Sequence, residues 1–432
     1  MIIKIDRGGR IEKDNDKTIT ANLVVMDMGH HMAMYYAPVT PTEVSSVGVM
    51  VKHCDQNYMG LNIAPELAKR GYHVLAVDAW VGGEIDRKCE HLSKMVKYMR
   101  SQPGIEKVVL MGHSGGATLM TAYQAIAENG PQVFQGENMI YPCTVREPLE
   151  PADAIMLLDA NYGNAVMSLL SLDPAVTEEW NGMKLDPKFD IFDPANGYAK
   201  DGASYSPEFI RMYQKAQRDR NERLINYALD RLAKIEKGEG NYVDDEPFMI
   251  TAADQPKPNN RLLPEDLHLL AHTKGEYDLL HGDGSITHEP IRCLRTPEMD
   301  RCFSMTYGMG VNKNTIRGFL SSQAIRTTGD FAVTEDDVLG VDWHSSYASP
   351  VGNIEHISVP ALFVGMTGGY EYLASEIIYN HAKMADKSIA FVRGASHNFV
   401  LNRDAEKVYG SFGDTEKALF DYIAGWMRKF VR

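Results

Sequence analysis

Short runs of apolar residues recur along the chain and alternate with segments whose apolar residues are spaced as on one face of a helix. Residues 47–51, 72–78 and 107–111 are apolar and rich in β-branched side chains, which is typical of buried strands. Residues 64–70 and 92–100 have helical spacing and end near Gly or Pro-Gly. The alternation predicts an α/β fold, with a doubly wound, mostly parallel sheet that has helices on both faces.

Further apolar runs at residues 154–158, 361–364 and 388–392 extend this pattern towards the C-terminus. Between them, from about residue 164 to residue 345, the alternation stops, and the sequence is typical of helices and irregular loops. We therefore predict three parts, which are a first core part over 1–164, an inserted, mainly helical cap or lid over 165–345, and a second core part over 346–432.

The amino-acid composition limits the classes of binding partner and the cellular compartments that fit the sequence. With 44% apolar and 24% charged residues, the 432-residue chain is typical of a globular protein. Its net charge of −14 argues against nucleic acid and anionic membranes as partners. The first residues lack the apolar core of a secretory signal, and no run approaches the roughly 18 apolar residues of a membrane span. The five scattered cysteines contain no C-x-x-C pair. We expect a cytoplasmic protein with a small-molecule substrate, and a homodimer is compatible with the sequence.

The most informative motif is Gly112-His113-Ser114-Gly115-Gly116, which stands between the strand at 107–111 and a helix. It fits G-x-S-x-G, in which a sharp strand-to-helix turn exposes a Ser hydroxyl above the sheet. The start of the helix also offers backbone N–H groups to a developing oxyanion. We therefore predict that Ser114 is a nucleophile, and the alternative is a purely structural glycine turn.

A Ser hydroxyl needs a base that takes its proton, and the base is expected on a loop after the last strand. His397 lies there, just beyond residues 388–392 and close to the C-terminus. We predict that His397 is the general base and that His113, inside the motif, shapes the pocket.

A carboxylate should hold the tautomer of the base, usually from the loop after the penultimate strand. Glu371 is the first carboxylate after the strand at 361–364 and is our first choice. Asp159, which ends the strand at 154–158, is the main alternative. Glu376 is a third, although it should already belong to the following helix.

The oxyanion hole needs a second backbone N–H, which is expected after the strand at 47–51. The N–H of Asp55 or of Cys54 would pair with that of Gly115, and Cys54 is not expected to be the nucleophile. The segment His281-Gly-Asp-Gly284 is similar to an oxyanion loop of some esterases, but its place in the insertion favours a tight Asp-Gly turn.

The elbow at Gly112 to Gly116, the His53-Cys54-Asp55 loop, the chain order and the late His397 resemble the α/β-hydrolase fold family over roughly residues 15–164 and 346–432. The resemblance implies an eight-stranded, mostly parallel sheet, a Ser-acid-His triad, no metal or organic cofactor, and usually ester hydrolysis. The chain departs from the family at Cys54, where many members have Gly, and at Gly368-Gly369-Tyr370-Glu371, where many have an Asp.

In this fold an insertion after the strand ending near Asp159 would lie over the nucleophile and select the substrate. Its candidate lining residues are apolar or aromatic, although more of them should be cap core than pocket: Leu169, Leu170, Trp180, Met305, Tyr307, Met309, Phe319, Leu320, Phe331 and Trp343. The 23 methionines would suit an irregular pocket. We predict a serine hydrolase for an ester, thioester or lactone of a bulky hydrophobic or aromatic molecule. C–C or amide bond cleavage and a catalytically silent ligand-binding protein are the alternatives.

Overall fold

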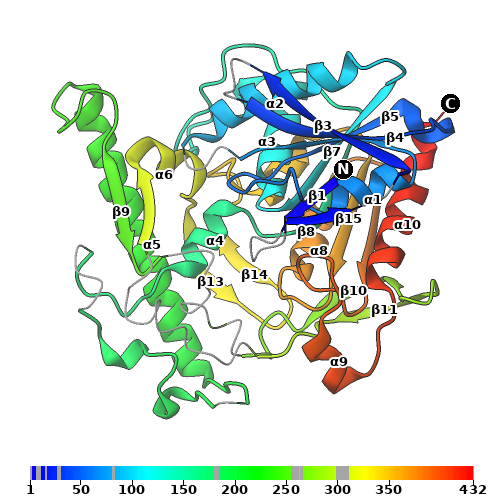
Figure 1. Cartoon of the computed structure of the whole chain (residues 1–432). Helices are drawn as coiled ribbons and strands as arrows, with labels where there is room; N and C mark the ends of the chain where they lie inside the picture. The colour runs from blue at the N-terminus through cyan, green and yellow to red at the C-terminus, as the bar shows by residue number, and fades with distance from the viewer. Residues whose placement is uncertain are drawn as a thin grey trace.

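A ten-stranded sheet forms the centre of the computed structural model (Figure 1), which describes residues 2–5, 11–14, 17–26, 31–79, 83–179, 184–199, 201–253, 262, 266–297 and 311–431. Neighbouring strands follow one another in the order β11 (Ile286–Arg292), β10 (His272–Leu280), β16 (Lys387–Val392), β15 (Ala361–Met366), β8 (Ala154–Ala160), β7 (Lys107–Ser114), β5 (Val47–Val51), β6 (His73–Val77), β4 (His31–Pro38) and β3 (Ile19–Met26). The pairs from β10 to β6 are parallel, and the pairs β11–β10, β6–β4 and β4–β3 are antiparallel. The predicted α/β class and mostly parallel sheet are confirmed.

The two faces of the sheet are buried in two separate hydrophobic clusters. Along β7, Val108 and Leu110 belong to one cluster, and Val109 and Met111 belong to the other. This alternation follows from the two-residue period of a strand, and it explains why the central strands are apolar at nearly every position.

Helices cover both faces. On one face lie α2 (Ile85–Arg100), α3 (Gly116–Asn129) and α8 (Tyr372–His381), whose apolar residues join the first cluster. On the other face lie α1 (Ile63–Lys69) and α10 (Thr415–Met427), whose apolar residues join the second. The short helices α7 (Pro350–Asn353) and α9 (Arg403–Tyr409) and the strand pair β1 (Ile2–Ile5) and β2 (Ile11–Asp14) complete the core part. No helix in the described ranges combines the length and the apolar character needed to cross a membrane.

The predicted insertion over 165–345 does not lie wholly outside the sheet. Strands β10 and β11 fall inside this range, yet β10 runs parallel to β16 through the pairs Asp278–Ala390, Leu279–Phe391 and Leu280–Val392. The sheet therefore has two more strands at this edge than the eight that the family resemblance implies. A tight turn joins β10 to β11, with hydrogen bonds from His281 N to Ser285 O and from Gly284 N to His281 O.

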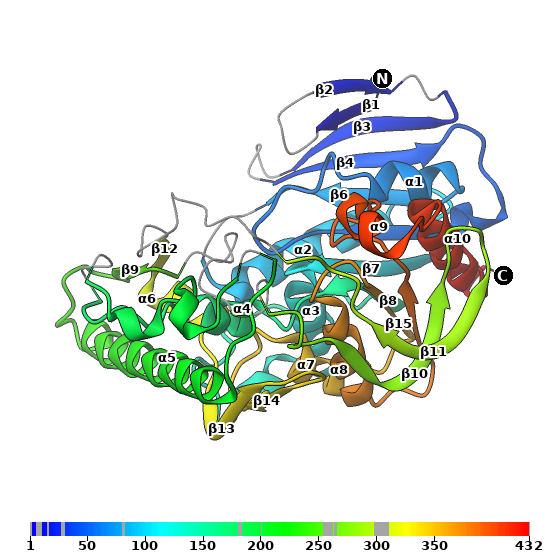
Figure 2. The ribbon, with the colours of Figure 1, turned by 90° about the horizontal axis from the view of Figure 1, so that it is seen from below.

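The rest of the insertion gathers beside the sheet (Figure 2). It comprises α4 (Asn164–Ser171), α5 (Pro207–Glu236), β9 (Pro247–Thr251) paired with β12 (Val311–Thr315), α6 (Ile316–Ser322), and β13 (Thr327–Val333) paired with β14 (Val338–Val341). Ser206 caps the start of α5 by accepting a hydrogen bond from Phe209 N. Leu224 and Ile225 of α5 are buried in the same cluster as residues of α2 and α3.

Candidate active site

The strand β7 turns directly into α3 at Ser114, whose φ of 55° is unusual for a residue with a side chain. The neighbouring glycines permit the turn because the backbone is crowded there. A Cβ on Gly112 would lie 2.8 Å from Cα of Ala117, and a Cβ on Gly116 would lie 2.6 Å from the carbonyl oxygen of Lys52. The G-x-S-x-G segment is thus a strained elbow pressed against the loop that follows β5.

His397 lies on a tight turn after β16. The turn is closed by hydrogen bonds from Ser396 N to Val400 O and from Phe399 N to Ser396 O, each 2.8 Å long. The imidazole Nδ1 of His397 lies 2.7 Å from Oδ2 of Asp159. Since β7, β8 and β16 run parallel, Ser114, Asp159 and His397 all lie at the carboxyl edge of the sheet.

Asp159 is held on both of its carboxylate oxygens. It ends β8 with a φ of 41° and is fully buried. Oδ2 faces His397, and Oδ1 accepts a hydrogen bond of 2.7 Å from Met366 N at the end of β15. Burial raises the pKa of Asp159 to about 6, and the charge of nearby Glu371 adds to the rise, whereas the hydrogen bond from His397 opposes it.

This geometry departs from our first choice of acid. Glu371 precedes α8, and its carboxylate lies within 4.8 Å of ligand atoms of both Asp159 and His397. The imidazole Nδ1–H of His397 nevertheless donates its hydrogen bond to Asp159 and not to Glu371. Glu376 serves another purpose, since it is buried and accepts hydrogen bonds from Lys274 N and Gly275 N of β10.

In the described part of the chain, Asp159, Glu371 and His397 are also the one group of three or more His, Cys, Asp or Glu side chains that lie close enough together to hold a metal ion. Both oxygens of Asp159 and Nδ1 of His397 already form hydrogen bonds within the protein. A metal ion would have to break these bonds, so the group fits an acid and its base better than a metal centre.

The loop after β5 differs from the expected oxyanion loop. The N–H groups of Asp55 and Gln56 both donate to Nδ1 of His53, at 3.0 Å each. The Asp55 N–H, which we expected to face the oxyanion, is therefore directed at a side chain of its own loop. Because Nδ1 accepts two hydrogen bonds, the ring proton of His53 lies on Nε2. Burial lowers the pKa of His53 to about 4, so the ring is neutral.

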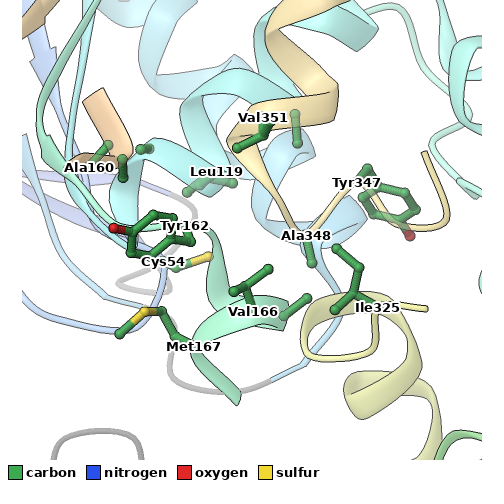
Figure 3. Packing of buried hydrophobic residues seen from close by; sticks show 14 of the residues in the cluster. Cys54, Leu119, Ala160, Tyr162, Val166, Met167, Ile325, Tyr347, Ala348 and Val351 are labelled. Atoms are coloured by element: carbon green, nitrogen blue, oxygen red, sulfur yellow. The ribbon is translucent and has the colours of Figure 1, made fainter. Parts of the chain in front are cut away.

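Cys54 lies beside this loop with its side chain fully buried. It belongs to the hydrophobic cluster that also contains Tyr162, Val166 and Met167, which Figure 3 shows around it. Burial raises the pKa of its thiol to about 11, which disfavours the reactive thiolate.

Buried charges that the sequence analysis missed support the same loop. The Asp55 carboxylate forms an ion pair of 2.6 Å with Lys88, whose side chain is 2% exposed, and Asn164 Nδ2 lies 3.3 Å from it. Lys52 donates to the carbonyl oxygen of Asp78, and burial lowers its pKa to about 8. In the sequence, Lys88 looks like a solvent-facing residue of a helix, so no local signal distinguishes it.

The candidate lining residues of the cap mostly form hydrophobic core. Trp343 is partly buried and packs against the larger hydrophobic cluster. The buried candidates belong to that cluster, and they are Leu169, Leu170, Phe319, Leu320 and Phe331. The other candidates, Trp180, Met305, Tyr307 and Met309, lie outside the described residues.

Comparisons with known proteins give matches of two kinds. A family model described as a protein of unknown function (DUF1749) matches residues 62–150. The siderophore hydrolase EstB from Aspergillus fumigatus is 12% identical, with a TM-score of 0.44, and the match covers 97% of this chain and 99% of that one. The α/β hydrolase GrgF from Penicillium sp. sh18 is 11% identical, with a TM-score of 0.42, over 96% and 99% of the two chains. No curated protein matches the chain. Identities this low do not transfer a substrate.

Proposed function

We propose that this chain, which has the α/β-hydrolase fold, is a serine hydrolase that cleaves a carboxylic ester, thioester or lactone. The observation that carries the proposal is the hydrogen bond between His397 and buried Asp159 beside the strained elbow of Ser114. Nucleophile, acid and base follow in the chain order Ser114, Asp159 near the end of the next core strand, and His397 after the last core strand, and all three lie at the carboxyl edge of the sheet. This is the order that the motif requires.

In the proposed reaction, Ser114 Oγ attacks the carbonyl carbon while His397 takes its proton through Nε2. Asp159 keeps the proton of the neutral imidazole on Nδ1 and stabilises the imidazolium that forms. His397 then gives the proton to the leaving group, and water hydrolyses the acyl-enzyme with the same base. The Asp159 side chain suits this role because its two oxygens are already oriented by Met366 N and the imidazole.

The oxyanion of the tetrahedral intermediate would be held by the N–H of Gly115, at the start of α3, and by that of Cys54. Cys54 replaces Asp55 as our proposed loop donor because the Asp55 N–H is bonded to His53. The Lys88–Asp55 ion pair and the His53 ring hold the loop close to the elbow. Two convergent donors at the oxyanion lower the barrier by several kcal/mol.

Bulky hydrophobic or aromatic substrates are our proposal for the substrate class. The helix that follows the acid strand, α4, is apolar, and its Val166 and Met167 pack in the cluster that contains Cys54 of the oxyanion loop. Faster turnover of acetate than of every bulky ester would contradict this preference. A cytoplasmic location is also proposed, since Cys54, Cys89, Cys143 and Cys293 are free thiols.

Labelling with a fluorophosphonate probe tests the proposal without knowledge of the substrate. We expect one probe per chain, mapped to the peptide that contains Ser114, and none in the Ser114→Ala variant. Folded protein that takes up no probe would contradict a serine hydrolase and favour the silent ligand-binding alternative. Labelled enzyme is then tested on esters, thioesters, lactones, amides and C–C substrates, because the same triad can cleave all of these bonds.

A further inference from the structure

Two buried side chains connect the elbow to the loops on either side of it. Oη of Tyr58, in the loop after β5, lies 2.6 Å from Nδ1 of His113 in the elbow. Nε2 of the same imidazole lies 2.7 Å from the backbone carbonyl oxygen of His397. Both side chains are buried. A chain of two hydrogen bonds thus joins the oxyanion loop, the nucleophile elbow and the base loop.

The carbonyl partner fixes the direction of one of these bonds. A carbonyl oxygen only accepts, so His113 donates to His397 through Nε2–H. When Nε2 alone carries a ring proton, Nδ1 is an acceptor, and the Tyr58 hydroxyl donates to it. In this tautomer His113 has no free lone pair with which to take a proton from Ser114. His113 therefore holds the base loop and is not itself the base.

The loop that receives the second bond is strained. Phe399, two residues after His397, has a φ of 71°, and its ring centroid lies 4.5 Å from that of His113. The ring of His397 lies 4.7 Å from His113. His397 is thus held at two points, by Asp159 at the imidazole and by His113 at the backbone carbonyl.

We propose that Tyr58 and His113 are positioning residues that hold the backbone of His397 so that its imidazole reaches Ser114. This inference rests on the proposed serine hydrolase function and deepens it. Neither side chain needs to touch the substrate. A base displaced by a fraction of an ångström transfers the proton more slowly while substrate binding is unchanged. Loss of either bond should therefore lower kcat and leave KM unchanged.

The variant Tyr58→Phe removes one hydroxyl and keeps the ring. We expect kcat for p-nitrophenyl butyrate and the rate constant of fluorophosphonate labelling to fall about threefold to tenfold, with KM within about twofold of wild type. Tyr35→Phe is the matched control, because Tyr35 Oη forms the same kind of bond, 2.7 Å long, with Nδ1 of His73 between β4 and β6. This control should label at the wild-type rate.

A second pair of variants separates the hydrogen bond from packing. His113→Gln keeps an N–H that can reach the carbonyl of His397, whereas His113→Leu does not. At equal thermal stability, the Gln variant should be labelled at least about three times faster than the Leu variant. Wild-type kinetics in Tyr58→Phe, or equal rates in the two His113 variants, would overturn the inference. Failure of the wild type itself to label would instead overturn the proposed function, and this inference with it.

Discussion

At the scale of single residues, the site depends on a carboxylate in an unfavourable place. Asp159 is fully buried, and its backbone has a positive φ of 41°. A carboxylate oxygen of Glu371 also lies within 4.8 Å of a carboxylate oxygen of Asp159. Such strain and burial persist when the surrounding structure compensates for them. Here the Met366 N–H and the imidazole provide the compensation.

The role of Asp159 leads to a first prediction. Asp159→Asn should lower kcat by about 10⁴-fold, because an amide cannot stabilise the imidazolium or keep the tautomer. Glu371→Gln should retain kcat within about tenfold, since the imidazole keeps its hydrogen bond to Asp159. Steady-state kinetics of the two variants on one ester decide between the acids. The reverse ranking would return the role to Glu371.

The ionised Asp159 carboxylate should lower the free energy of unfolding at neutral pH. Burial raises its pKa from 3.8 to about 6, so the folded state binds this proton more tightly than the unfolded state does. Its stabilising contribution is therefore complete below pH 3.8 and is lost as the pH rises through about 6. At pH 7 the ionised group costs about 3 kcal/mol of unfolding free energy.

Urea unfolding at two pH values tests this cost. Asp159→Asn should be more stable than wild type at pH 7, by up to about 3 kcal/mol, and the difference should shrink at pH 4, where the native Asp159 is protonated. Turnover of the wild type should fall as the pH drops below about 6. A variant that is less stable than wild type at pH 7 would show that the hydrogen bonds of the carboxylate outweigh its burial.

The sequence predicted some of these residues and could not predict others. Ser114 and His397 have local signals, which are the spacing of glycines around the Ser and the position of the His after the last core strand. The acid has no such signal, because Asp159 and Glu371 are each the first carboxylate after a strand. Which of them meets the imidazole depends on the relative position of β8 and β15. The contacts of Lys88 and Tyr58 are likewise made by residues far apart in the chain.

At the scale of elements, the elbow and the oxyanion loop can approach each other closely because Gly116 has no side chain. A Cβ on Gly116 would meet the carbonyl oxygen of Lys52 at 2.6 Å and Cα of His53 at 3.3 Å. Both are backbone atoms, so neither can move aside as a flexible side chain does. The distance between the two loops, and hence the oxyanion geometry, depends on this glycine.

We therefore predict that Gly116→Ala slows fluorophosphonate labelling by about 100-fold or more and destabilises the protein by about 1 to 3 kcal/mol. Gly136→Ala is the control, because a Cβ there would meet no atom within 4 Å. Labelling rates and thermal unfolding of both variants are the measurements. Wild-type labelling of Gly116→Ala would mean that the two loops need not lie so close.

The strands β10 and β11 could not be predicted from the pattern of apolar residues. The central strands are apolar on both faces and were found. By contrast, β11 is exposed at every position except Ile291, and β10 is half polar. The edge strand β11 and its neighbour β10 need not be apolar at every position, because part of each meets solvent. β10 is placed by pairing with β16, which is far away in the sequence, and β11 is placed by pairing with β10. The turn between β10 and β11 was recognisable from His281-Gly-Asp-Gly284.

At the scale of the whole molecule, the inserted segment beside the sheet and the sheet itself share one hydrophobic cluster. Ile225 of α5 and Phe319 of α6 belong to the same cluster as Leu119 of α3, beside the elbow. β10 and β11, from the same stretch of sequence, complete the sheet next to the base loop. An inserted segment that shared no core with the sheet could unfold separately, whereas a shared core couples the two parts.

This coupling leads to a prediction about unfolding. Ile225 is fully buried on α5, so Ile225→Ala should destabilise the whole molecule by about 2 to 5 kcal/mol. Met212→Ala, on the more exposed side of the same helix, should change stability by less than about 1 kcal/mol. Far-ultraviolet circular dichroism, tryptophan fluorescence and residual labelling of Ser114 should follow one urea transition, which shifts as a unit in Ile225→Ala. A separate early transition, which moves alone in Ile225→Ala while labelling of Ser114 persists, would show that the inserted segment folds independently. The site would then belong to the sheet and its covering helices alone, and the inserted segment would be a separate folding unit.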